Sequence, residues 1–342
     1  MNKIKIAQIG ICHEHAPGKI HTLREHLAGS FEIVGYVDES GFAATPWLPA
    51  ARQPELYRGL PRLTMDEALN YPGLQAVLIE MPNNELVPTA QRFAERGVAI
   101  HMDKPPGEDR QAYRRLLGEC ERRRLPFQMG YMFRNNPAMN FAGDAIARGW
   151  LGEIFAIDCG MSHNYGDASY HDYIGKFAGG VMFNLGCHLI DFAVAVLGRP
   201  CTVVPILRSA PGFEEPVRNN CVAVLEYPHA LVTLHVSSCE IGGIEHRRMK
   251  ICGTGGTLEF SPLERFDGAP QELAMTLARA ADGVAAGART IGFEPRSDRY
   301  VEQLGEFAGM IRGQVADRYT REHDLLVHEV TLRASGFALQ AD

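Results

Sequence analysis

The chain has 342 residues, of which 46% are hydrophobic and 22% charged. This composition is typical of a globular protein, and the length exceeds that of one ordinary hydrophobic core, so we expect two domains. A formal net charge of −7 argues against a nucleic-acid binder, which would carry a basic face.

Membrane and disulfide signals are absent from the sequence. No apolar run approaches the roughly 20 residues that span a bilayer, and the 8 cysteines contain no CxxC pair. The first residues predict a strand and have no long apolar segment of the signal-peptide type. We therefore expect a cytoplasmic protein with reduced thiols, no zinc knuckle and no contact with membranes.

The beginning of the chain predicts a βαβ unit. A short apolar strand ends at Gly10, a helix-compatible segment covers residues 19–27, and a second strand, residues 31–38, ends at Asp38. At the tip of the second strand of a dinucleotide fold, a carboxylate hydrogen-bonds the adenosine ribose and repels a 2′-phosphate. Asp38 therefore favours NAD as cofactor, with NADP second.

The loop after Gly10 departs from the dinucleotide fingerprint. A GxGxxG motif begun at Gly10 would need glycines at the positions of Cys12 and His15. The bulk of these side chains predicts a loop that bends differently or binds phosphate more weakly. An ordinary strand-to-helix loop is an equal alternative, and we take Gly10, Cys12 and His13 as candidate cofactor contacts.

The strand–helix alternation continues to about residue 135. Lys104 follows the apolar strand 98–103, and ligands of doubly wound sheets bind beyond the carboxyl ends of the strands. Lys104 is therefore well placed to contact a substrate oxygen, the alternative being a surface lysine in a turn. The other elements expected in this part are a loop with short helical turns (42–64), strands 74–81 and 127–131, and helices 86–96, 111–124 and 137–148.

A polar stripe marks the helix expected after Gly179-Gly180. The apolar run that follows ends at Gly198, which predicts a glycine cap. Asn184, His188 and Asp191 are spaced i, i+4 and i+7, so one helix face would carry all three. Polar groups on a buried helix are costly unless they bond one another or a ligand. We hypothesise that the stripe faces a substrate, the alternative being a satisfied core histidine.

The remainder predicts an open sheet closed by two helices. The expected strands are 221–227, 231–237, 248–253 and 257–261, and the closing helices are 299–312 and 321–337. Gly253–Gly256 is a hairpin turn, because no helix follows it as a phosphate loop requires. Residues 265–296 show no clear pattern.

Four segments, in this order, resemble the glucose–fructose oxidoreductase / inositol dehydrogenase family (Gfo/Idh/MocA). They are the Ile9-Gly10 strand with Asp38, the Ala76-to-Asn83 strand and turn, Asp103-Lys104-Pro105, and Gly179–Asp191. Asp103-Lys104-Pro105 is similar to the family's Glu-Lys-Pro signature with a conservative change of the acid. Gly179–Asp191 is similar to its GGxxxDxGxHxxD signature, with Asn184 in place of the first Asp.

The resemblance implies a fold and an activity. The fold is α/β, with an N-terminal Rossmann doubly wound parallel sheet (1–130) and a C-terminal α/β domain (131–342) that has a large open, mostly antiparallel sheet for substrate binding and oligomerisation. The closing helices can pack back on the first domain. The activity is that of an NAD(P)-dependent dehydrogenase acting on a CH–OH group of a sugar, sugar acid or polyol, in a homodimer or homotetramer.

The resemblance also implies roles for individual residues. His188 is the expected acid/base, Lys104 bonds the reacting oxygen, and Asn184 orients the substrate or His188. For Asp191 the alternatives are to hold the imidazole, to contact substrate, or to satisfy a buried backbone or arginine partner. The expected cofactor contacts gain Pro82, Asn83 and Lys104, and the expected substrate contacts are Tyr131, Arg134, His163, Tyr165, Asp191 and, with less support, Tyr170.

Two other functions stay open. The altered glycine loop and Asn184 are compatible with a family member that has lost redox activity and binds a ligand or regulates a partner. A metal-assisted sugar-modifying enzyme would need several histidines to converge with a carboxylate. The candidates are His13, His15, His101, His163, His171 and His188 with Asp167 or Asp172, although we expect no metal.

Overall fold

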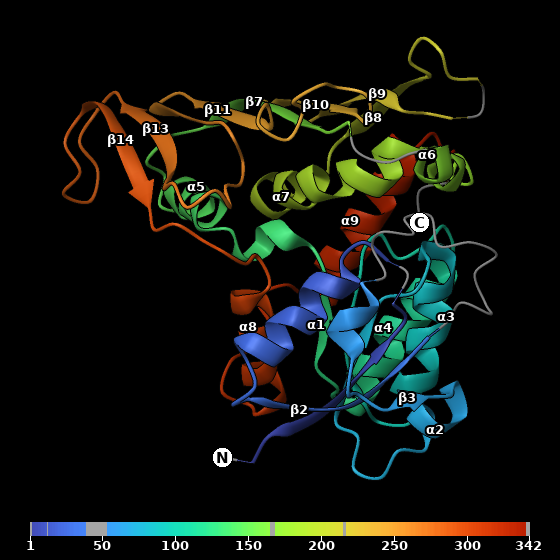
Figure 1. Cartoon of the computed structure of the whole chain (residues 1–342). Helices are drawn as coiled ribbons and strands as arrows, with labels where there is room; N and C mark the ends of the chain where they lie inside the picture. Colours follow the sequence, from blue (N-terminus) through green and yellow to red (C-terminus); the bar gives the residue numbers. More distant parts are fainter. Residues whose placement is uncertain (1, 12, 39–52, 165–167, 215–216, 340–342) are drawn as a thin grey trace. The chain divides into compact units, whose positions relative to one another are not determined.

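The computed structural model describes residues 2–11, 13–38, 53–164, 168–214 and 217–339 (Figure 1). It divides into two compact units. Unit 1 is Met1–Tyr131 with Asp298–Leu325, and unit 2 is Met132–Ser297 with Leu326–Asp342. Unit 1 thus includes a segment from late in the chain. The roles expected for the two domains, dinucleotide binding for the first and substrate binding with oligomerisation for the second, stay predictions.

The described residues of unit 1 form a six-stranded parallel sheet in the order β3-β2-β1-β4-β5-β6. This is the strand order of the Rossmann fold, in which the carboxyl ends of β1 and β4 flank the point where the order reverses. The strands are β1 (Ile4–Ile9), β2 (Phe31–Val37), β3 (Arg62–Leu63), β4 (Ala76–Ile79), β5 (Ala99–Met102) and β6 (Phe127–Met129).

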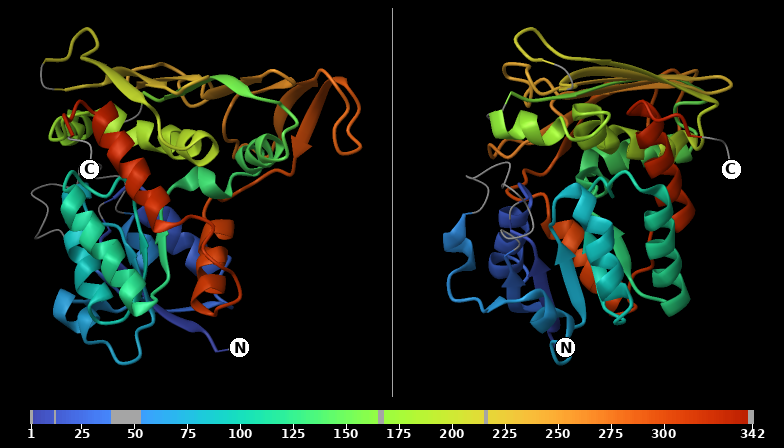
Figure 2. Two further views of the ribbon diagram at one scale, coloured as in Figure 1. Left: turned by 180° about the vertical axis from the view of Figure 1, so that it is seen from behind. Right: turned by 90° about the vertical axis from the view of Figure 1, so that its right-hand side faces the viewer.

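Helices cover both faces of this sheet (Figure 2). One face packs Ile6 and Leu78 of the sheet against Ile20 of α1 and Phe307 of α8. The other face is covered by α3 and α4, which pack against each other. The helical elements are α1 (Ala16–Glu25), a 3₁₀ turn (Pro54–Tyr57), α2 (Met65–Leu69), α3 (Asn83–Ala94), α4 (Arg110–Arg123) and α8 (Val301–Ile311).

Unit 2 is built on an eight-stranded mixed sheet in the order β14-β13-β12-β11-β7-β10-β9-β8. Only the β10–β7 pairing is parallel among these described strands. The strands are β7 (Ile154–Ser162), β8 (Thr202–Arg208), β9 (Asn220–Glu226), β10 (Leu231–Ser237), β11 (Arg248–Gly253), β12 (Gly256–Phe260), β13 (Gln271–Leu277) and β14 (Gly287–Phe293). The expected fold class is confirmed.

Helices α5 and α7 lie against one face of the second sheet, whereas its opposite face carries no helix among the described residues (Figure 1). The final helix, α9, spans the division between the units, which falls after Leu325. The helical elements are a 3₁₀ turn (Met132–Asn135), α5 (Pro137–Ala147), α6 (Ala168–Ile174), a π-helical turn (Met182–Gly186), α7 (Cys187–Leu197) and α9 (Arg321–Ala334).

Several elements differ from the sequence expectations. The first helix begins at Ala16 rather than at 19, and the part of 42–64 that the structure describes contains a short edge strand, β3, as well as the expected helical turn. Strands β7 and β8 were not expected, and the unassigned region contains β13 and β14. The hairpin turn before Gly256 and the Gly198 cap, with φ of 73°, are confirmed.

Candidate active site

Gly10 lies where β1 meets the end of β4. Its φ is 99°, and a Cβ added there would overlap the carbonyl group of Glu80. Only glycine tolerates both the backbone conformation and this close approach. The packing of the two strand ends therefore explains why this position is glycine, independently of any cofactor.

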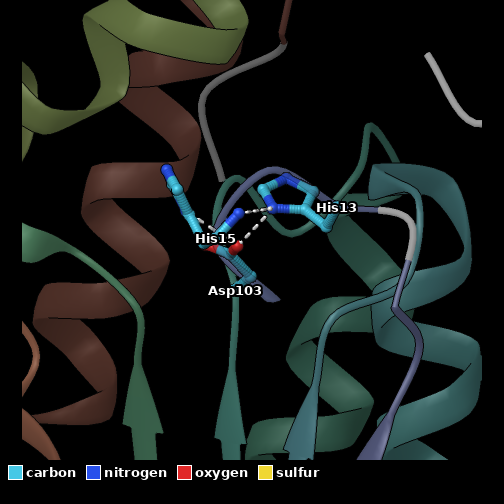
Figure 3. Close-up of side chains that lie close together, drawn as sticks. All are labelled: His13, His15 and Asp103. Atoms are coloured by element: carbon cyan, nitrogen blue, oxygen red, sulfur yellow. Dashed lines mark hydrogen bonds and ion pairs between the residues drawn. The ribbon is translucent and has the colours of Figure 1, made fainter. Parts of the chain in front are cut away.

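His13 and His15 turn back from the loop onto Asp103, which follows β5 (Figure 3). His13 Nδ1 lies 2.7 Å and His15 Nδ1 lies 2.9 Å from Asp103 Oδ2. All three side chains are buried. The sequence analysis placed His13 among the cofactor contacts but did not anticipate its partner, which is 90 residues away in the chain.

Burial and the neighbouring charges shift the pKa values in this cluster. Burial alone would raise the pKa of Asp103, but His13, His15 and Lys19 outweigh it and hold that pKa well below the usual range. Burial lowers the pKa of His15 to about 4, against the opposing attraction of Asp103. The cluster thus contains an ionised carboxylate beside an imidazole that is neutral at pH 7.

A second buried charge pair lies beneath this cluster. Lys19 Nζ is 2.6 Å from Glu80 Oε1 and 3.8 Å from Asp103 Oδ2, and both Lys19 and Glu80 are fully buried. Burial raises the pKa of Glu80 well above its usual range, although Lys19 opposes the shift. Sequence reasoning missed Lys19, whose available signal was its position on the apolar face of α1 between Ala16 and Leu23.

Asn83 fixes the segment that contains Lys104. Its Nδ2 donates hydrogen bonds to the carbonyl oxygens of Lys104 and Pro105, both at 3.0 Å. The Lys104 side chain is 1% exposed, and its main-chain N–H donates to Asp103 Oδ1 at 2.7 Å. Lys104 is therefore a buried lysine on a rigid turn, not a surface lysine. Pro82 immediately precedes α3, at its N-cap.

Asp38 follows the last residue of β2, as expected. Its carboxylate pairs with Arg62 of the edge strand β3, Nη2 to Oδ2, at 3.1 Å. The Arg62 side chain is 62% exposed and that of Asp38 is 16% exposed. The sequence analysis did not anticipate this cation, because β3 was not expected.

In unit 2, Arg134 and Asp191 bind each other. Arg134 Nε donates to Asp191 Oδ2 at 3.0 Å and Nη2 donates to Oδ1 at 2.7 Å, with both residues buried. Of the alternatives considered for Asp191, the structure provides the arginine partner. The contacts with substrate that we expect of Arg134 and Asp191 stay predictions.

His188 and Asn184 are both about 1% exposed. The His188 ring lies 5.6 Å from that of Phe133, measured between centroids. His188 and Asp191 lie on α7, but Asn184 lies in the π-helical turn before it, so the single regular helix expected here is wrong. π-Helical turns are rare and often occur at functional sites.

The remaining predicted substrate contacts are scattered. His163, just after β7, bonds Tyr170 of α6, Nε2 to Oη, at 3.1 Å, and both are buried. Tyr131 ends the first segment of unit 1, where its carbonyl accepts a hydrogen bond from Gln303. Cys12, Tyr165 and Asp167 lie outside the described residues.

Of the six candidate histidines, His13 and His15 converge with a carboxylate among the described residues, and this carboxylate, Asp103, was not among the candidates. Among the described residues, the one group of three or more potential ligands is His13, His15 and Asp103. His101 instead bonds Gln128, Nδ1 to Oε1, at 2.9 Å, and burial lowers its pKa to about 3. His171 Nε2 lies 3.2 Å from Ser238 Oγ.

Comparisons with known proteins agree with the fold. A family model, GFO/IDH/MocA C-terminal domain, matches residues 140–259. The rhizopine catabolism protein MocA of Rhizobium meliloti is 27% identical over 151 residues, 44% of this chain and about half (47%) of MocA. D-xylose 1-dehydrogenase (NADP(+)) 2 of Haloferax volcanii is 24% identical over 275 residues, 80% of this chain and 79% of that protein. Over residues 140–259 the chain is therefore similar to the GFO/IDH/MocA family.

A solved structure has the same fold. An oxidoreductase from Agrobacterium radiobacter, in complex with NAD⁺, L-tartaric acid and magnesium, superposes with a TM-score of 0.77 at 15% identity, covering 98% of this chain and 97% of that one. The resemblance noted in the sequence is therefore confirmed. Of the two segments that carry the resemblance, Asp103-Lys104-Pro105 belongs to unit 1 and Gly179–Asp191 to unit 2. The helices that the structure describes include none with the length and apolar character to cross a membrane.

Proposed function

We propose that this chain is an oxidoreductase that transfers a hydride between a nicotinamide cofactor and a hydroxyl or keto carbon of a sugar, sugar acid or polyol. The observation that carries the proposal is Lys104, buried on a rigid turn at the carboxyl end of β5 in a sheet of Rossmann order. Ligands of such sheets bind beyond the carboxyl ends of the strands. The Haloferax volcanii relative is named as a sugar dehydrogenase and the Agrobacterium radiobacter protein as an oxidoreductase, which supports the same reaction class.

The described residues of unit 1 fit a dinucleotide in two respects. Asp38 presents a partly exposed carboxylate at the tip of β2, where it can accept hydrogen bonds from ribose hydroxyls. The first turn of α1 has no side-chain cap, so its positive dipole end favours an anion such as a phosphate, although the Ala16 N–H donates to the His13 carbonyl oxygen and Pro17 has no N–H. With Gly10, His13, Pro82, Asn83 and Lys104, these residues are the proposed cofactor contacts. NAD is the proposed cofactor, because Asp38 repels a 2′-phosphate.

When bound, the nicotinamide supplies the hydride acceptor or donor. The chain supplies the proton transfer and the stabilisation of charge. Lys104 donates a hydrogen bond to the reacting oxygen, and His188 takes the hydroxyl proton as general base. Asn184 orients the substrate through its amide, which carries no charge and so cannot raise the basicity of His188 as a carboxylate would.

Unit 2 is proposed to hold the substrate and to form the oligomer. The proposed substrate contacts of this unit are Arg134, His163, Tyr165 and Asp191, and Arg134 and Asp191 also bind each other. Tyr131, the last residue of the first segment of unit 1, is a further proposed substrate contact. Val204, Ile206 and Leu231 are 46%, 46% and 53% exposed, and the strand register puts them on one face of the second sheet. An exposed apolar face of this kind is typical of interfaces, so we propose a homodimer or homotetramer through it.

The test is a panel of sugars, sugar acids and inositols assayed with NAD and with NADP at the absorbance of the reduced nicotinamide. We expect turnover of at least one substrate, and a loss of on the order of 10²–10⁴-fold in kcat for His188→Ala. Lys104→Met is expected to lower kcat/KM to a similar degree. His229→Ala, a histidine on an exposed turn, is the control.

The outcomes separate the alternatives. Full turnover by His188→Ala would remove that residue from the mechanism. A folded protein that binds neither NAD, measured by calorimetry, nor NADH, measured by nicotinamide fluorescence, would contradict the dehydrogenase and favour the redox-inactive ligand-binding or regulatory protein.

A further inference from the structure

Three potential metal ligands converge in unit 1 (Figure 3). The nearest donor atoms of His13, His15 and Asp103 all lie within 4.8 Å of one another. They come from two segments, the loop after β1 and the end of β5. His15 is 8% exposed, whereas His13 and Asp103 are 1% and 0% exposed, so the cluster approaches solvent only at His15.

The His15 ring lies between two carboxylates. Its Nδ1 faces Asp103 Oδ2 at 2.9 Å, and its Nε2 faces Glu14 Oε1 at 3.4 Å. A neutral imidazole has a single N–H and can donate to only one of these two carboxylates. A metal ion on Nδ1 would leave the proton on Nε2, directed at Glu14. Carboxylate–histidine–metal arrangements of this kind are the usual second shell of a metal site.

The ring nitrogen of His13 has a similar conflict. Nδ1 of His13 is 3.3 Å from the main-chain N–H of His15, which can only donate, and 2.7 Å from Asp103 Oδ2, which as a carboxylate can only accept. One nitrogen cannot both present a lone pair to the N–H and a proton to the carboxylate. A cation among the three donor atoms would accept lone pairs from His13 Nδ1 and Asp103 Oδ2 and so replace the proton between them, and the single lone pair of Nδ1 would then no longer accept from the His15 N–H.

The surroundings leave the Asp103 carboxylate available as a ligand. Lys19 lies 3.8 Å from Asp103 but only 2.6 Å from Glu80, which is therefore its principal partner. The other oxygen of Asp103 accepts the Lys104 N–H at 2.7 Å. Ligating carboxylates are commonly oriented by such a hydrogen bond.

We propose that His13, His15 and Asp103 bind a divalent transition-metal ion, with zinc as the ion of first choice. Two imidazole nitrogens and one carboxylate oxygen are a known zinc ligand set in which a fourth, open position takes water. The imidazoles select against magnesium and calcium, which prefer oxygen ligands. Tetrahedral zinc would hold its ligand atoms roughly 3.3 Å apart, so Asp103 and the two rings would move outward by a few tenths of an ångström.

The experiment measures metal content and affinity in the full chain. Protein purified without chelators is analysed by inductively coupled plasma mass spectrometry, and the stripped protein is titrated with Zn²⁺, Co²⁺, Mg²⁺ and Ca²⁺ by calorimetry. We expect one Zn²⁺ or Co²⁺ per chain, a Co²⁺ absorption spectrum of tetrahedral type, and no response to Mg²⁺ or Ca²⁺.

Variants separate this site from chance binding elsewhere. His15→Gln is expected to abolish stoichiometric binding, and Glu14→Gln to weaken it on the order of 10–100-fold, the effect typical of a second-shell change. His21→Gln, on the exposed side of α1, is the matched control and should bind as the parent does. Circular dichroism checks that each variant is folded.

Absence of stoichiometric metal in the parent protein, or binding that survives in folded His15→Gln, would overturn the proposal. This site does not rest on the proposed redox function. Nicotinamide binding is measured separately, so a protein that binds zinc but no NAD would contradict only the dehydrogenase, and the reverse result would contradict only the metal site.

Discussion

Asp191 of α7 accepts two hydrogen bonds from the Arg134 guanidinium, at 3.0 and 2.7 Å, in the interior of unit 2. The two residues are 57 positions apart, so the pair ties the 3₁₀ turn at Met132–Asn135 to the helix that carries His188. Removing one partner of such a pair leaves a buried charge uncompensated, which costs more than the intact pair contributes.

Arg134→Met is therefore expected to lower the free energy of unfolding by about 3–5 kcal/mol, measured by urea denaturation. Arg134→Met combined with Asp191→Leu should be less destabilised than either single variant, because no charge is left buried. Arg265→Ala, which breaks an exposed pair with Asp267, is the control and should leave the free energy of unfolding nearly unchanged. Equal losses in the buried and exposed variants would contradict the interpretation of Arg134–Asp191 as a buried ion pair.

The sequence was informative where one residue type implied one local role. Lys104 and Asp38 were located at strand ends because apolar runs such as 76–79 end abruptly in turn residues. The partners of these residues could not be predicted. Asp103 meets His15 only because β1 and β5 end at the same edge of the sheet, and Arg62 meets Asp38 through a two-residue strand with no sequence signature.

The second sheet was only partly predictable for a related reason. Strand β13 alternates between buried and exposed residues, but its exposed positions, Glu272, Ala274 and Thr276, are also common in helices and loops. β14 is an edge strand with no fully buried residue, so its apolar signal is weak. The π-helical turn at Asn184 replaces regular helix over a few residues that have ordinary helical composition. Tertiary packing decides these segments.

The close packing around Gly10 can be tested by comparing it with Gly118, which has open space around it. Gly10→Ala is expected to destabilise unit 1 by several kcal/mol, because φ is 99° and the added methyl group would overlap the Glu80 carbonyl. Gly118→Ala, within α4 and with open space around it, is expected to stabilise the protein by about 0.5–1 kcal/mol. Thermal unfolding followed by circular dichroism measures both, and a neutral Gly10→Ala would show that the two strand ends do not pack as described.

The cysteines are expected to differ in reactivity according to burial. Burial raises the pKa of the Cys120 thiol to about 12, so its thiolate, the nucleophilic form, is about a thousandfold scarcer at neutral pH than at the ordinary pKa of 9.0. Cys201 is exposed. Peptide mapping after iodoacetamide treatment at about neutral pH should find label on Cys201. Cys120 should stay unlabelled until urea is added. Equal labelling of both in the folded protein would contradict the burial of Cys120.

Arg62 is expected to set how strongly Asp38 discriminates between NAD and NADP. The Arg62 guanidinium, 3.1 Å from the Asp38 carboxylate, offsets part of the negative charge that repels a 2′-phosphate. Arg62→Ala should therefore increase the preference for NAD, whereas Asp38→Asn should shift the preference toward NADP by on the order of tenfold, equivalent to about 1.4 kcal/mol. The ratio of the dissociation constants for NADPH and NADH, from nicotinamide fluorescence, measures both changes.

The control for this pair is Arg92→Ala. Arg92 is also an exposed arginine of unit 1, paired with Asp66 at 3.6 Å, and Asp66 does not follow β2. Its loss changes the net charge of the protein as Arg62→Ala does, so any effect of net charge alone appears in both variants. A ratio that moves equally in Arg62→Ala and Arg92→Ala would show that Arg62 acts by its general charge and not through Asp38.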